Sequence, residues 1–302
     1  MQNDTVIISS IDNLELATRI AYNLDVQLMK ADLRIFSDGE SKIRMDSVSN
    51  KRCIIIHSTY PFADQRLMQL FMMIYKCNRD GAKDICALTP YMAYSRQDKA
   101  FIDGEVISIN LIGEILESIG TNQLVTVDIH NPEILSTFSF RTNNISAIPL
   151  LACYVSDQLK LHSALIISPD KGSINRAAEL AKLLNTDMIS LVKIRDIHTG
   201  EIQAKFEGSK SIRDRDVIIL DDMITTGNSI INAAKVLKEL GVKNIFVLCT
   251  HALLLENAIA RLRDAGIKDI IATNSIPNDF ARVDLAAMLS QYLLGLITSS
   301  RQ

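Results

Sequence analysis

The chain has 302 residues, of which 48% are hydrophobic and 22% are charged, and its formal net charge is -3. This length favours two domains over one, and the lack of a basic excess excludes the usual electrostatic footprint of a nucleic-acid-binding protein. Five cysteines without close pairs, no leader pattern at the N-terminus and no apolar run of membrane-spanning length predict a cytoplasmic protein without a membrane partner.

The first half of the chain alternates short runs of β-branched residues with longer segments of helical period. Strands are predicted at residues 5–9, 52–57, 85–89 and 124–127, and helices at residues 12–24, 65–79 and 108–118. The helices carry apolar residues at spacings of three and four, and Asp12 is available to cap the first of them. This order predicts parallel strands joined by helical crossovers, which is an α/β fold.

The second half repeats the same alternation. Strands are predicted at residues 164–167, 188–191, 217–220, 244–249 and 269–272, and helices at residues 174–184, 229–240 and 256–265. A last helix at residues 283–296 can pack on either half. We therefore predict two similar domains, residues 1–148 and 149–302, each a mostly parallel sheet flanked by helices.

Residues 217–229 carry the strongest functional signal. They read Val-Ile-Ile-Leu-Asp-Asp-Met-Ile-Thr-Thr-Gly-Asn-Ser, which predicts a buried strand, a tight turn and the start of a helix. Gly227 allows a ligand to approach the backbone, the hydroxyls of Thr225, Thr226 and Ser229 can donate hydrogen bonds, and the helix start offers N–H groups. Because ligands of open α/β sheets bind at the carboxyl ends of strands, this pattern predicts a phosphate site.

The two acids in this segment point to the rest of the ligand. Carboxylates cannot face a phosphate, so Asp221 and Asp222 suit the vicinal hydroxyls of a sugar. Together the acids and the loop predict a ribose 5-phosphate site. The alternative is an ordinary strand end with an Asp-rich turn and a hydroxyl helix cap, which explains one acid and one hydroxyl but not the full set.

This segment resembles the phosphoribosyl-pyrophosphate-binding motif that type I phosphoribosyltransferases and ribose-phosphate pyrophosphokinases share. The resemblance implies a phosphoribosyltransferase-like fold for each domain. It also implies that ribose 5-phosphate contacts Asp221, Asp222, Thr225, Thr226, Gly227, Asn228 and Ser229. It does not separate the two groups of enzymes.

Three segments of the first half resemble the pyrophosphokinases in particular. Residues 36–40, Phe-Ser-Asp-Gly-Glu, are similar to the family's Phe-Pro-Asp-Gly-Glu segment, which serves ATP in a neighbouring subunit. Residues 94–98, Tyr-Ser-Arg-Gln-Asp, and 128–130, Asp-Ile-His, are similar to its Tyr-Ala-Arg-Gln-Asp and Asp-Leu-His segments. The resemblance implies that ATP is bound by Phe36, Asp38, Gly39, Glu40, Arg96, Gln97, Asp98 and His130. Taken alone, an Asp-Gly turn and a solvated polar loop would explain the first two segments.

Residues 168–172, Ser-Pro-Asp-Lys-Gly, resemble the family's Ser-Pro-Asp-x-Gly turn. The resemblance implies that Asp170, together with His130, binds the metal, and a carboxylate does suit Mg2+. Asp170 can instead cap the helix that follows. Ser173 stands where the family commonly has glycine.

Lys193-Ile194-Arg195 opens a long polar stretch and resembles the family's catalytic flexible loop. The resemblance implies that Lys193 and Arg195 are catalytic, and that Arg195 also reaches ribose 5-phosphate. Alternate residues of an extended segment face one way, so both side chains can bear on one polyphosphate. The alternative is a solvated basic loop with Asp196 as partner. This loop and the Thr225-Thr226-Gly227 form of the phosphate loop are similar to the archaeal-type branch.

These segments cover nearly the whole chain, which is identified as a member of the ribose-phosphate pyrophosphokinase family. The resemblance implies transfer of the diphosphoryl group of ATP to the anomeric hydroxyl of ribose 5-phosphate, with Mg2+ as cofactor, in a homo-oligomer that is a dimer or a hexamer. Two alternatives are a type I phosphoribosyltransferase, in which residues 36–40 and 96–99 have no purpose, and a noncatalytic regulatory subunit. The intact set of Lys193, Arg195 and sugar-site acids argues against the second.

Overall fold

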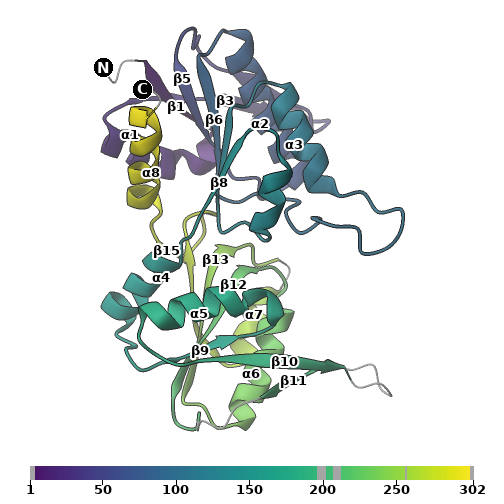
Figure 1. Cartoon of the computed structure of the whole chain (residues 1–302), viewed down its shortest axis with the longest axis vertical. Helices are drawn as coiled ribbons and strands as arrows, with labels where there is room; N and C mark the ends of the chain where they lie inside the picture. Colours follow the sequence, from purple (N-terminus) through teal and green to yellow (C-terminus); the bar gives the residue numbers. More distant parts are fainter. Residues whose placement is uncertain (1–3, 196–201, 207–211, 256, 300–302) are drawn as a thin grey trace. The chain divides into compact units, whose positions relative to one another are not determined.

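The computed structural model describes residues 4–195, 202–206, 212–255 and 257–299, of which 192–195, 202–206 and 299 are described without their side chains. The chain forms two compact units (Figure 1). Unit 1 comprises Met1–Ile145, Ser275–Pro277 and Asp284–Gln302, and unit 2 comprises Ser146–Asn274 and Asn278–Val283. Each is built on a mainly parallel sheet, which confirms the predicted α/β class.

Unit 1 contains a six-stranded sheet in the order β2-β1-β5-β6-β7-β8, and all neighbouring strands in it are parallel. Helices α2 and α3 pack on one face, and α1 and α8 lie on the other (Figure 1). A separate hairpin is formed by β3 and β4. The bounds are β1 Thr5–Ser9, α1 Leu14–Leu24, β2 Gln27–Lys30, β3 Asp32–Ile35, β4 Ser41–Arg44, β5 Arg52–Ile56, α2 Ala63–Arg79, β6 Asp84–Thr89, α3 Ser108–Ser118, β7 Gln123–Val127, β8 Arg141–Ile145 and α8 Ala286–Ser299.

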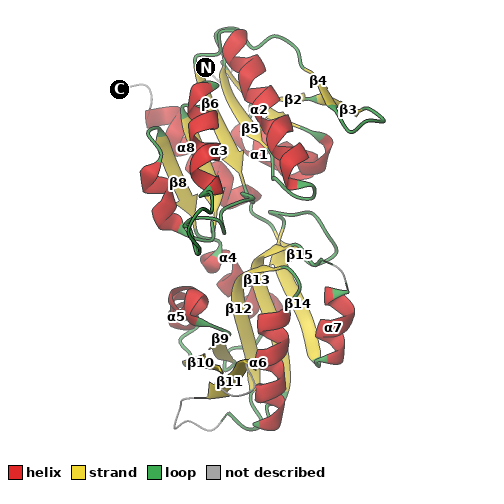
Figure 2. Ribbon diagram, turned by 90° about the vertical axis from the view of Figure 1, so that its right-hand side faces the viewer, coloured by secondary structure: helices red, strands yellow, loops and turns green. Residues whose placement is uncertain are grey.

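Unit 2 contains a seven-stranded sheet in the order β11-β10-β9-β12-β13-β14-β15. The pair β10 and β11 is antiparallel, and the other pairs are parallel. Helices α4 and α5 pack on one face, and α6 and α7 on the other (Figure 2). The bounds are α4 Ile148–Tyr154, β9 Leu165–Ser168, α5 Ile174–Leu183, β10 Met188–Arg195, β11 Ile202–Phe206, β12 Asp216–Ile224, α6 Asn228–Glu239, β13 Asn244–Ala252, α7 Ala258–Asp264, β14 Ile267–Thr273 and β15 Ala281–Val283.

The central strands are mainly apolar because helices cover both faces of each sheet. In β5, Ile54, Ile55 and Ile56 are at most 2% exposed, so neither face alternates with polar residues. Burying each of these side chains contributes about 1.5–3 kcal/mol relative to leaving it exposed. The runs of β-branched residues in the sequence therefore predicted these strands well.

Two strands are longer than their apolar runs predicted. We predicted strands at residues 217–220 and 188–191, whereas β12 continues to Ile224 and β10 to Arg195. Backbone pairing extends them: Ile224 lies opposite Ala252 of β13, and Arg195 lies opposite Ile202 of β11. The pairing uses backbone groups and does not depend on apolar side chains, so polar residues of the candidate site belong to strands and not to turns.

In each sheet the strand order reverses beside the first strand. The first strand of unit 1, β1, has β2 on one side and β5 on the other, and β9 in unit 2 lies likewise between β10 and β12. The carboxyl ends of the strands at such a switch point form the usual ligand crevice of an open α/β sheet. The two switch points are therefore the first places to look for a site.

The sequence did not determine on which domain the last helix packs. In the structure this helix, α8, belongs to unit 1. Arg19 of α1 pairs with Asp284 at 2.9 Å, and Nδ2 of Asn23 donates to Oγ of Ser290 at 3.2 Å. Among the described residues, no helix is long and apolar enough to cross a membrane.

Candidate functional site

The predicted acids of unit 2 lie at the switch point between β9 and β12. Oγ of Ser173 donates a 2.7 Å hydrogen bond to Oδ1 of Asp221, and the backbone N–H of Asp222 donates to the same oxygen at 2.9 Å. Ser173 is 1% exposed, whereas Asp221 is half-buried. Two donors therefore fix one carboxylate oxygen of Asp221. Ser173 was not predicted as a site residue; its only signal was that it replaces a common glycine.

The electrostatics of the two acids differ from those of surface carboxylates. Burial, and after it the negative charge of Asp222, raises the pKa of the Asp221 carboxyl well above its usual range, while the hydrogen bond from Ser173 acts in the opposite direction. Asp222 is only 4% exposed. Asp221 is thus the more accessible acid of the pair.

The phosphate loop lies directly after β12 and precedes α6. Gly227 has a φ of +73° and stands at the N-cap of α6, a backbone conformation that favours glycine. Thr225 and Thr226 are half-buried and Asn228 is exposed, so the loop reaches the surface. Together with Ser229, these residues form the strand-turn-helix arrangement that the sequence predicted, with the helix start available to an anion.

Asp170 follows β9 on the other side of the same switch point. Its Oδ1 accepts the N–H of Gly172 at 3.1 Å, and its carbonyl oxygen accepts the hydroxyl of Ser168 at 2.7 Å. It therefore caps the short 3-10 helix Lys171–Ser173, as one alternative predicted. This cap orients the carboxylate and is compatible with a further role for it.

Lys193 and Arg195 occupy alternate positions of β10, opposite Ala204 and Ile202 of β11. Their side chains lie outside the described part of the structure, and so do residues 196–200, which were predicted to continue the loop. The backbone places both positions in the strand next to β9, one strand from the switch point.

In unit 1, the segment Phe36 to Glu40 forms the tip of the hairpin between β3 and β4. The N–H of Phe36 donates to the carbonyl of Glu40 at 2.8 Å, and Oδ1 of Asp38 accepts the N–H of Glu40 at 3.1 Å. Gly39 has a φ of +92°. The guanidinium of Arg34 lies 5.0 Å from the ring centre of Phe36. The tip is exposed, so its side chains are accessible to a ligand or to another subunit.

The other two predicted nucleotide segments meet at the carboxyl ends of β6 and β7. Nδ2 of Asn131 donates to Oδ2 of Asp98 at 2.6 Å, which joins the Arg96 to Asp98 segment to the one that ends at His130. Arg96 and His130 are exposed. Asn131 was not predicted as a site residue, although it directly follows one.

The first turn of α2 connects these segments to the hairpin. The hydroxyl of Tyr94 donates to the carboxylate of Asp64, and Nε2 of Gln65 donates to the carbonyl of Gly39 at 3.3 Å. A cavity of about 590 Å³ lies beside the hairpin and is lined by Ile35, Phe62, Ala63, Asp64 and Gln65. Unit 1 therefore brings the predicted nucleotide segments into one neighbourhood through α2.

The switch point of unit 1, between β1 and β5, is filled by buried polar side chains. Nε2 of His57 donates to the carbonyl of Arg66 at 3.0 Å, and Nδ1 accepts the hydroxyl of Ser10 at 3.2 Å. Oδ1 of Asn13 accepts the N–H of Ser58 at 2.8 Å. Burial, and then the positive charge of Arg66, lowers the pKa of His57 to about 4, so its ring is neutral near pH 7.

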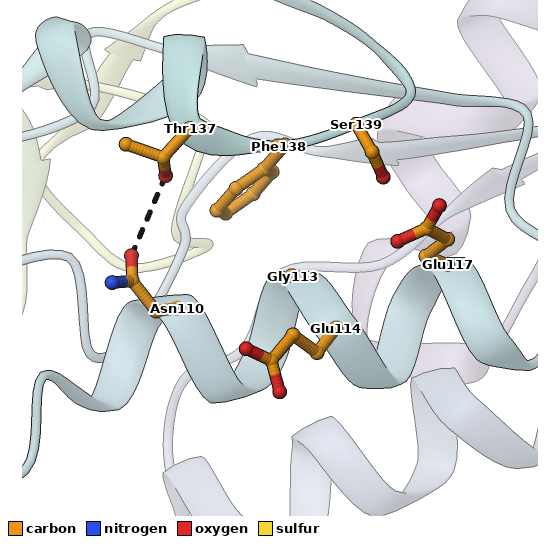
Figure 3. Close-up of a pocket in the computed structure, with 7 residues that line it drawn as sticks. All are labelled: Asn110, Gly113, Glu114, Glu117, Thr137, Phe138 and Ser139. Carbon is orange, nitrogen blue, oxygen red and sulfur yellow. Dashed lines mark hydrogen bonds between the residues drawn. The ribbon is translucent and has the colours of Figure 1, made fainter.

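Another cavity of unit 1, of about 190 Å³, lies between α3 and the chain after the 3-10 helix Pro132–Thr137 (Figure 3). The hydroxyl of Thr137 donates to Oδ1 of Asn110 at 3.4 Å across it. A Cβ on Gly113 would lie 2.6 Å from the ring of Phe138, so the ring needs a glycine on α3. Its lining residues are Asn110, Gly113, Glu114, Glu117, Thr137, Phe138 and Ser139. None was predicted as a site residue.

Comparisons with known proteins show the family of the chain. Residues 5–120 match the model of the N-terminal domain of ribose phosphate pyrophosphokinase, and residues 208–292 match that of the phosphoribosyl synthetase-associated domain. The chain is 34% identical to the ribose-phosphate pyrophosphokinase of Methanobrevibacter smithii over 95% of its length and 99% of the relative's. It is 35% identical to that of Saccharolobus solfataricus, over 88% and 92%.

A solved structure is similar over nearly the whole chain. It is the phosphoribosylpyrophosphate synthetase from Mycobacterium smegmatis, which is 27% identical and superposes with a TM-score of 0.88 over 98% of this chain and 100% of that one. The likeness therefore includes both units.

Proposed function

The chain belongs to the ribose-phosphate pyrophosphokinase family, and we propose that unit 2 holds the sugar phosphate while segments of unit 1 bind the nucleotide. The enzyme transfers the diphosphoryl group of ATP to the anomeric hydroxyl of ribose 5-phosphate, giving 5-phosphoribosyl 1-pyrophosphate and AMP. The observation that carries the assignment of residues is the gathering of two acids and a phosphate loop at the switch point of β9 and β12.

Ribose 5-phosphate is bound at this switch point. The 5-phosphate lies on the loop from Thr225 to Ser229, where hydroxyls and N–H groups at the start of α6 donate to its oxygens. The carboxylates of Asp221 and Asp222 orient the ribose hydroxyls, and the two donors on Oδ1 of Asp221 fix that side chain before substrate arrives. Arg195 is predicted to contribute a positive charge to the binding of the 5-phosphate.

The nucleotide is bound by the exposed segments of unit 1. They are Phe36, Asp38, Gly39 and Glu40 on the hairpin and Arg96, Gln97, Asp98 and His130 after β6 and β7. The guanidinium of Arg96 suits phosphate oxygens or stacking on a purine. If the hairpin serves a neighbouring subunit, the enzyme is a homo-oligomer, and its state, dimer or hexamer, stays a prediction, as does its place in the cytoplasm.

The residues present fit Mg2+ in the manner usual for phosphoryl transfer. Among the described side chains, no three His, Cys, Asp or Glu residues gather around one point. Mg2+ is commonly held by one or two carboxylates together with substrate phosphates and water, and the oriented carboxylate of Asp170 at the switch point suits that role. The role of His130 as a metal ligand stays a prediction. When bound, the ion neutralises charge on the phosphate oxygens.

Transfer of the diphosphoryl group requires alignment and charge neutralisation more than covalent chemistry from the protein. The sugar site aligns the anomeric hydroxyl for attack on the β-phosphorus. Lys193 and Arg195, at alternate positions of β10, supply the positive charge that matches the growing negative charge of the transition state. Replacing either residue is expected to lower kcat strongly and to change the affinity for the substrates less.

The test is a steady-state assay with purified protein, Mg2+, ATP and ribose 5-phosphate that follows AMP and 5-phosphoribosyl 1-pyrophosphate together. We expect Lys193→Ala to lower kcat by about 10³-fold. We expect Asp221→Asn to lower kcat/KM for ribose 5-phosphate by ~10²-fold. Asp216→Asn, at the other end of β12, is the matched control and should retain activity.

The opposite results would separate the alternatives. Absence of turnover by well-folded wild-type protein would favour a noncatalytic regulatory subunit. Turnover that is equally insensitive to changes at Asp221 and Asp216 would remove the sugar site from the switch point of unit 2 and leave the activity intact.

A further inference from the structure

The phosphate loop is braced from one side by the chain that follows β13. The carbonyl oxygen of Ile224 accepts the N–H groups of Leu253 and Leu254, both at 2.9 Å. The next carbonyl oxygen, that of Thr225, accepts the N–H of Leu255 at 3.1 Å. Two successive carbonyls at the start of the loop therefore point toward the same neighbouring segment.

A side chain of α7 continues this pattern at the third carbonyl. Nη1 of Arg261 donates to the carbonyl oxygen of Thr226 at 3.4 Å, and Nη2 donates to Oδ1 of Asn228 at 2.5 Å. Arg261 is exposed and lies 35 and 33 residues along the chain from these two partners. One guanidinium thus connects the middle of the loop to the first residue of α6.

The residue after Arg261 supports the loop from the same helix. A Cβ on Gly227 would lie 3.1 Å from Cδ2 of Leu262, whose side chain is fully buried. The backbone of the loop therefore lies directly on Leu262. Helix α7 holds the loop in two ways, with an apolar contact under Gly227 and polar contacts on both sides of it.

The direction of the carbonyls determines where the loop presents its donors. In a trans peptide unit, the C=O of one residue and the N–H of the next point in opposite directions. Because the carbonyls of residues 224–226 point toward residues 253–261, the N–H groups of Thr225, Thr226 and Gly227 point to the opposite side. Successive N–H groups that point the same way form a concave anion site.

We propose that Arg261 is a positioning residue of the ribose 5-phosphate site, which it serves by holding the Thr226 carbonyl and the Asn228 carboxamide so that the loop presents its N–H groups to the 5-phosphate. This inference rests on the proposed function, in which the loop binds that phosphate. Arg261 acts through the loop and through the conformation of Asn228, and the sugar end of the site, at Asp221, does not depend on it.

The experiment compares Arg261→Gln and Arg261→Lys with Arg263→Gln. Arg263 is exposed on the same helix, and its backbone carbonyl accepts the N–H groups of Ala265 and Gly266. Within the described part of the chain, its guanidinium makes no hydrogen bond to the phosphate loop. Binding of ribose 5-phosphate alone is measured by calorimetry, and KM for each substrate and kcat are measured in the steady state. Thermal unfolding of each variant reports whether the fold is retained.

We expect Arg261→Gln to weaken ribose 5-phosphate binding and to raise its KM by about tenfold, the effect of one hydrogen bond from a charged group, with kcat and the KM for ATP nearly unchanged. Arg261→Lys should recover only part of the loss, because an ammonium group cannot reproduce the two-pronged contact of a guanidinium. Arg263→Gln should match the wild type.

Two results would overturn the inference, and they differ from each other. Wild-type affinity for ribose 5-phosphate in a well-folded Arg261→Gln variant would remove Arg261 from the site and leave the proposed function standing. Failure of the wild-type protein itself to bind or turn over ribose 5-phosphate would remove the proposed function, and this inference with it.

Discussion

Both sheets have a switch point, and both switch points collect polar residues, but they use them differently. At the β1 and β5 switch point of unit 1, Asn13, His57 and Ser58 are at most 2% exposed. Asn13 accepts the N–H of Ser58, and His57 donates to the carbonyl of Arg66. At the β9 and β12 point of unit 2, Asp221 and Thr225 are half-buried and the loop reaches the surface.

The difference shows that topology determines where a site can form, whereas hydrogen-bond partners determine whether one does. In unit 1 the ring of His57, the N–H of Ser58 and Oδ1 of Asn13 are hydrogen-bonded within the protein, which contributes to stability, although Nδ2 of Asn13 is buried without a hydrogen-bond partner among the described residues. In unit 2 the protein fixes one oxygen of Asp221 and the carbonyl side of the loop, while Asp221 and Thr225 stay half-buried and Asn228 is exposed. The predictions below test these two uses, in order of expected size.

Acidification should weaken unit 1 through His57. Below pH 6.5 the unfolded chain takes up a proton on this ring, whereas the folded protein does so only near pH 4, so the free energy of unfolding falls as pH falls through this range. The full loss is about 3 kcal/mol. Urea unfolding at a series of pH values measures it.

The control for this prediction is His162, which is exposed in unit 2. His162→Gln should leave the slope of stability against pH unchanged between pH 4 and 6.5, whereas His57→Gln should flatten it. An unaltered slope in the His57 variant would contradict a buried neutral imidazole at the unit 1 switch point.

A methyl group on Gly227 should impair the unit 2 switch point. Gly227→Ala places a side chain at a φ of +73° and against Leu262, which costs ~1–2 kcal/mol. Because the strain falls on the phosphate loop, we expect KM for ribose 5-phosphate to rise by about tenfold. Steady-state kinetics measure the change.

Gly104→Ala provides the matched comparison, because Gly104 has a φ of +89° and no atom within 4 Å of its Cβ position. It should lose similar stability without a change in KM. Equal kinetic effects of the two variants would show that backbone strain in general, and not the shape of the phosphate loop, controls binding.

Removal of one hydroxyl from each switch point should affect substrate binding in unit 2 and stability in unit 1, and these are the smallest effects that we expect. Ser173→Ala removes a donor from Oδ1 of Asp221, so we expect ~fivefold lower kcat/KM for ribose 5-phosphate. The lost hydrogen bond had lowered the pKa of Asp221, so the rise of kcat/KM with pH, as the carboxylate ionises, should move to higher pH.

The counterpart in unit 1 is Ser58, whose buried hydroxyl donates to the carbonyl of Ser275 at 2.6 Å. Ser58→Ala should lower the free energy of unfolding by about 1 kcal/mol and leave the pH profile of kcat/KM in place. A shift of that profile in the Ser58 variant would contradict a purely structural role for the unit 1 switch point.

Sequence reasoning predicted the elements and the phosphate loop because both depend on local patterns. The strand at residues 5–9 and the turn that contains Gly227 need only neighbouring residues to be recognised. The extension of β12 to Ile224 was missed because it depends on pairing with β13, which apolar periodicity does not record.

The residues that hold the site were not predicted because their contacts are long-range. Ser173 reaches Asp221 across 48 residues, Arg261 reaches Asn228 across 33, and Asn131 reaches Asp98 across 33. The neighbouring sequence of a polar residue is the same whether its side chain faces solvent or bonds to a residue that is distant along the chain. Only the folded chain distinguishes the two.

The chain does not complete its units in the order in which it is synthesised. Unit 1 begins with the first strand, yet it also includes Ser275 and α8. The carbonyl of Ser275 accepts a hydrogen bond from the hydroxyl of Ser58, and the hydroxyl of Ser290 in α8 accepts one from the amide of Asn23 in α1. A ribosome must therefore translate the chain through α8 before unit 1 has all its parts, and by then all of the sequence of unit 2 has been translated. Nascent unit 1 is then the portion whose apolar surface waits longest for cover, and the portion that chaperones have most time to engage.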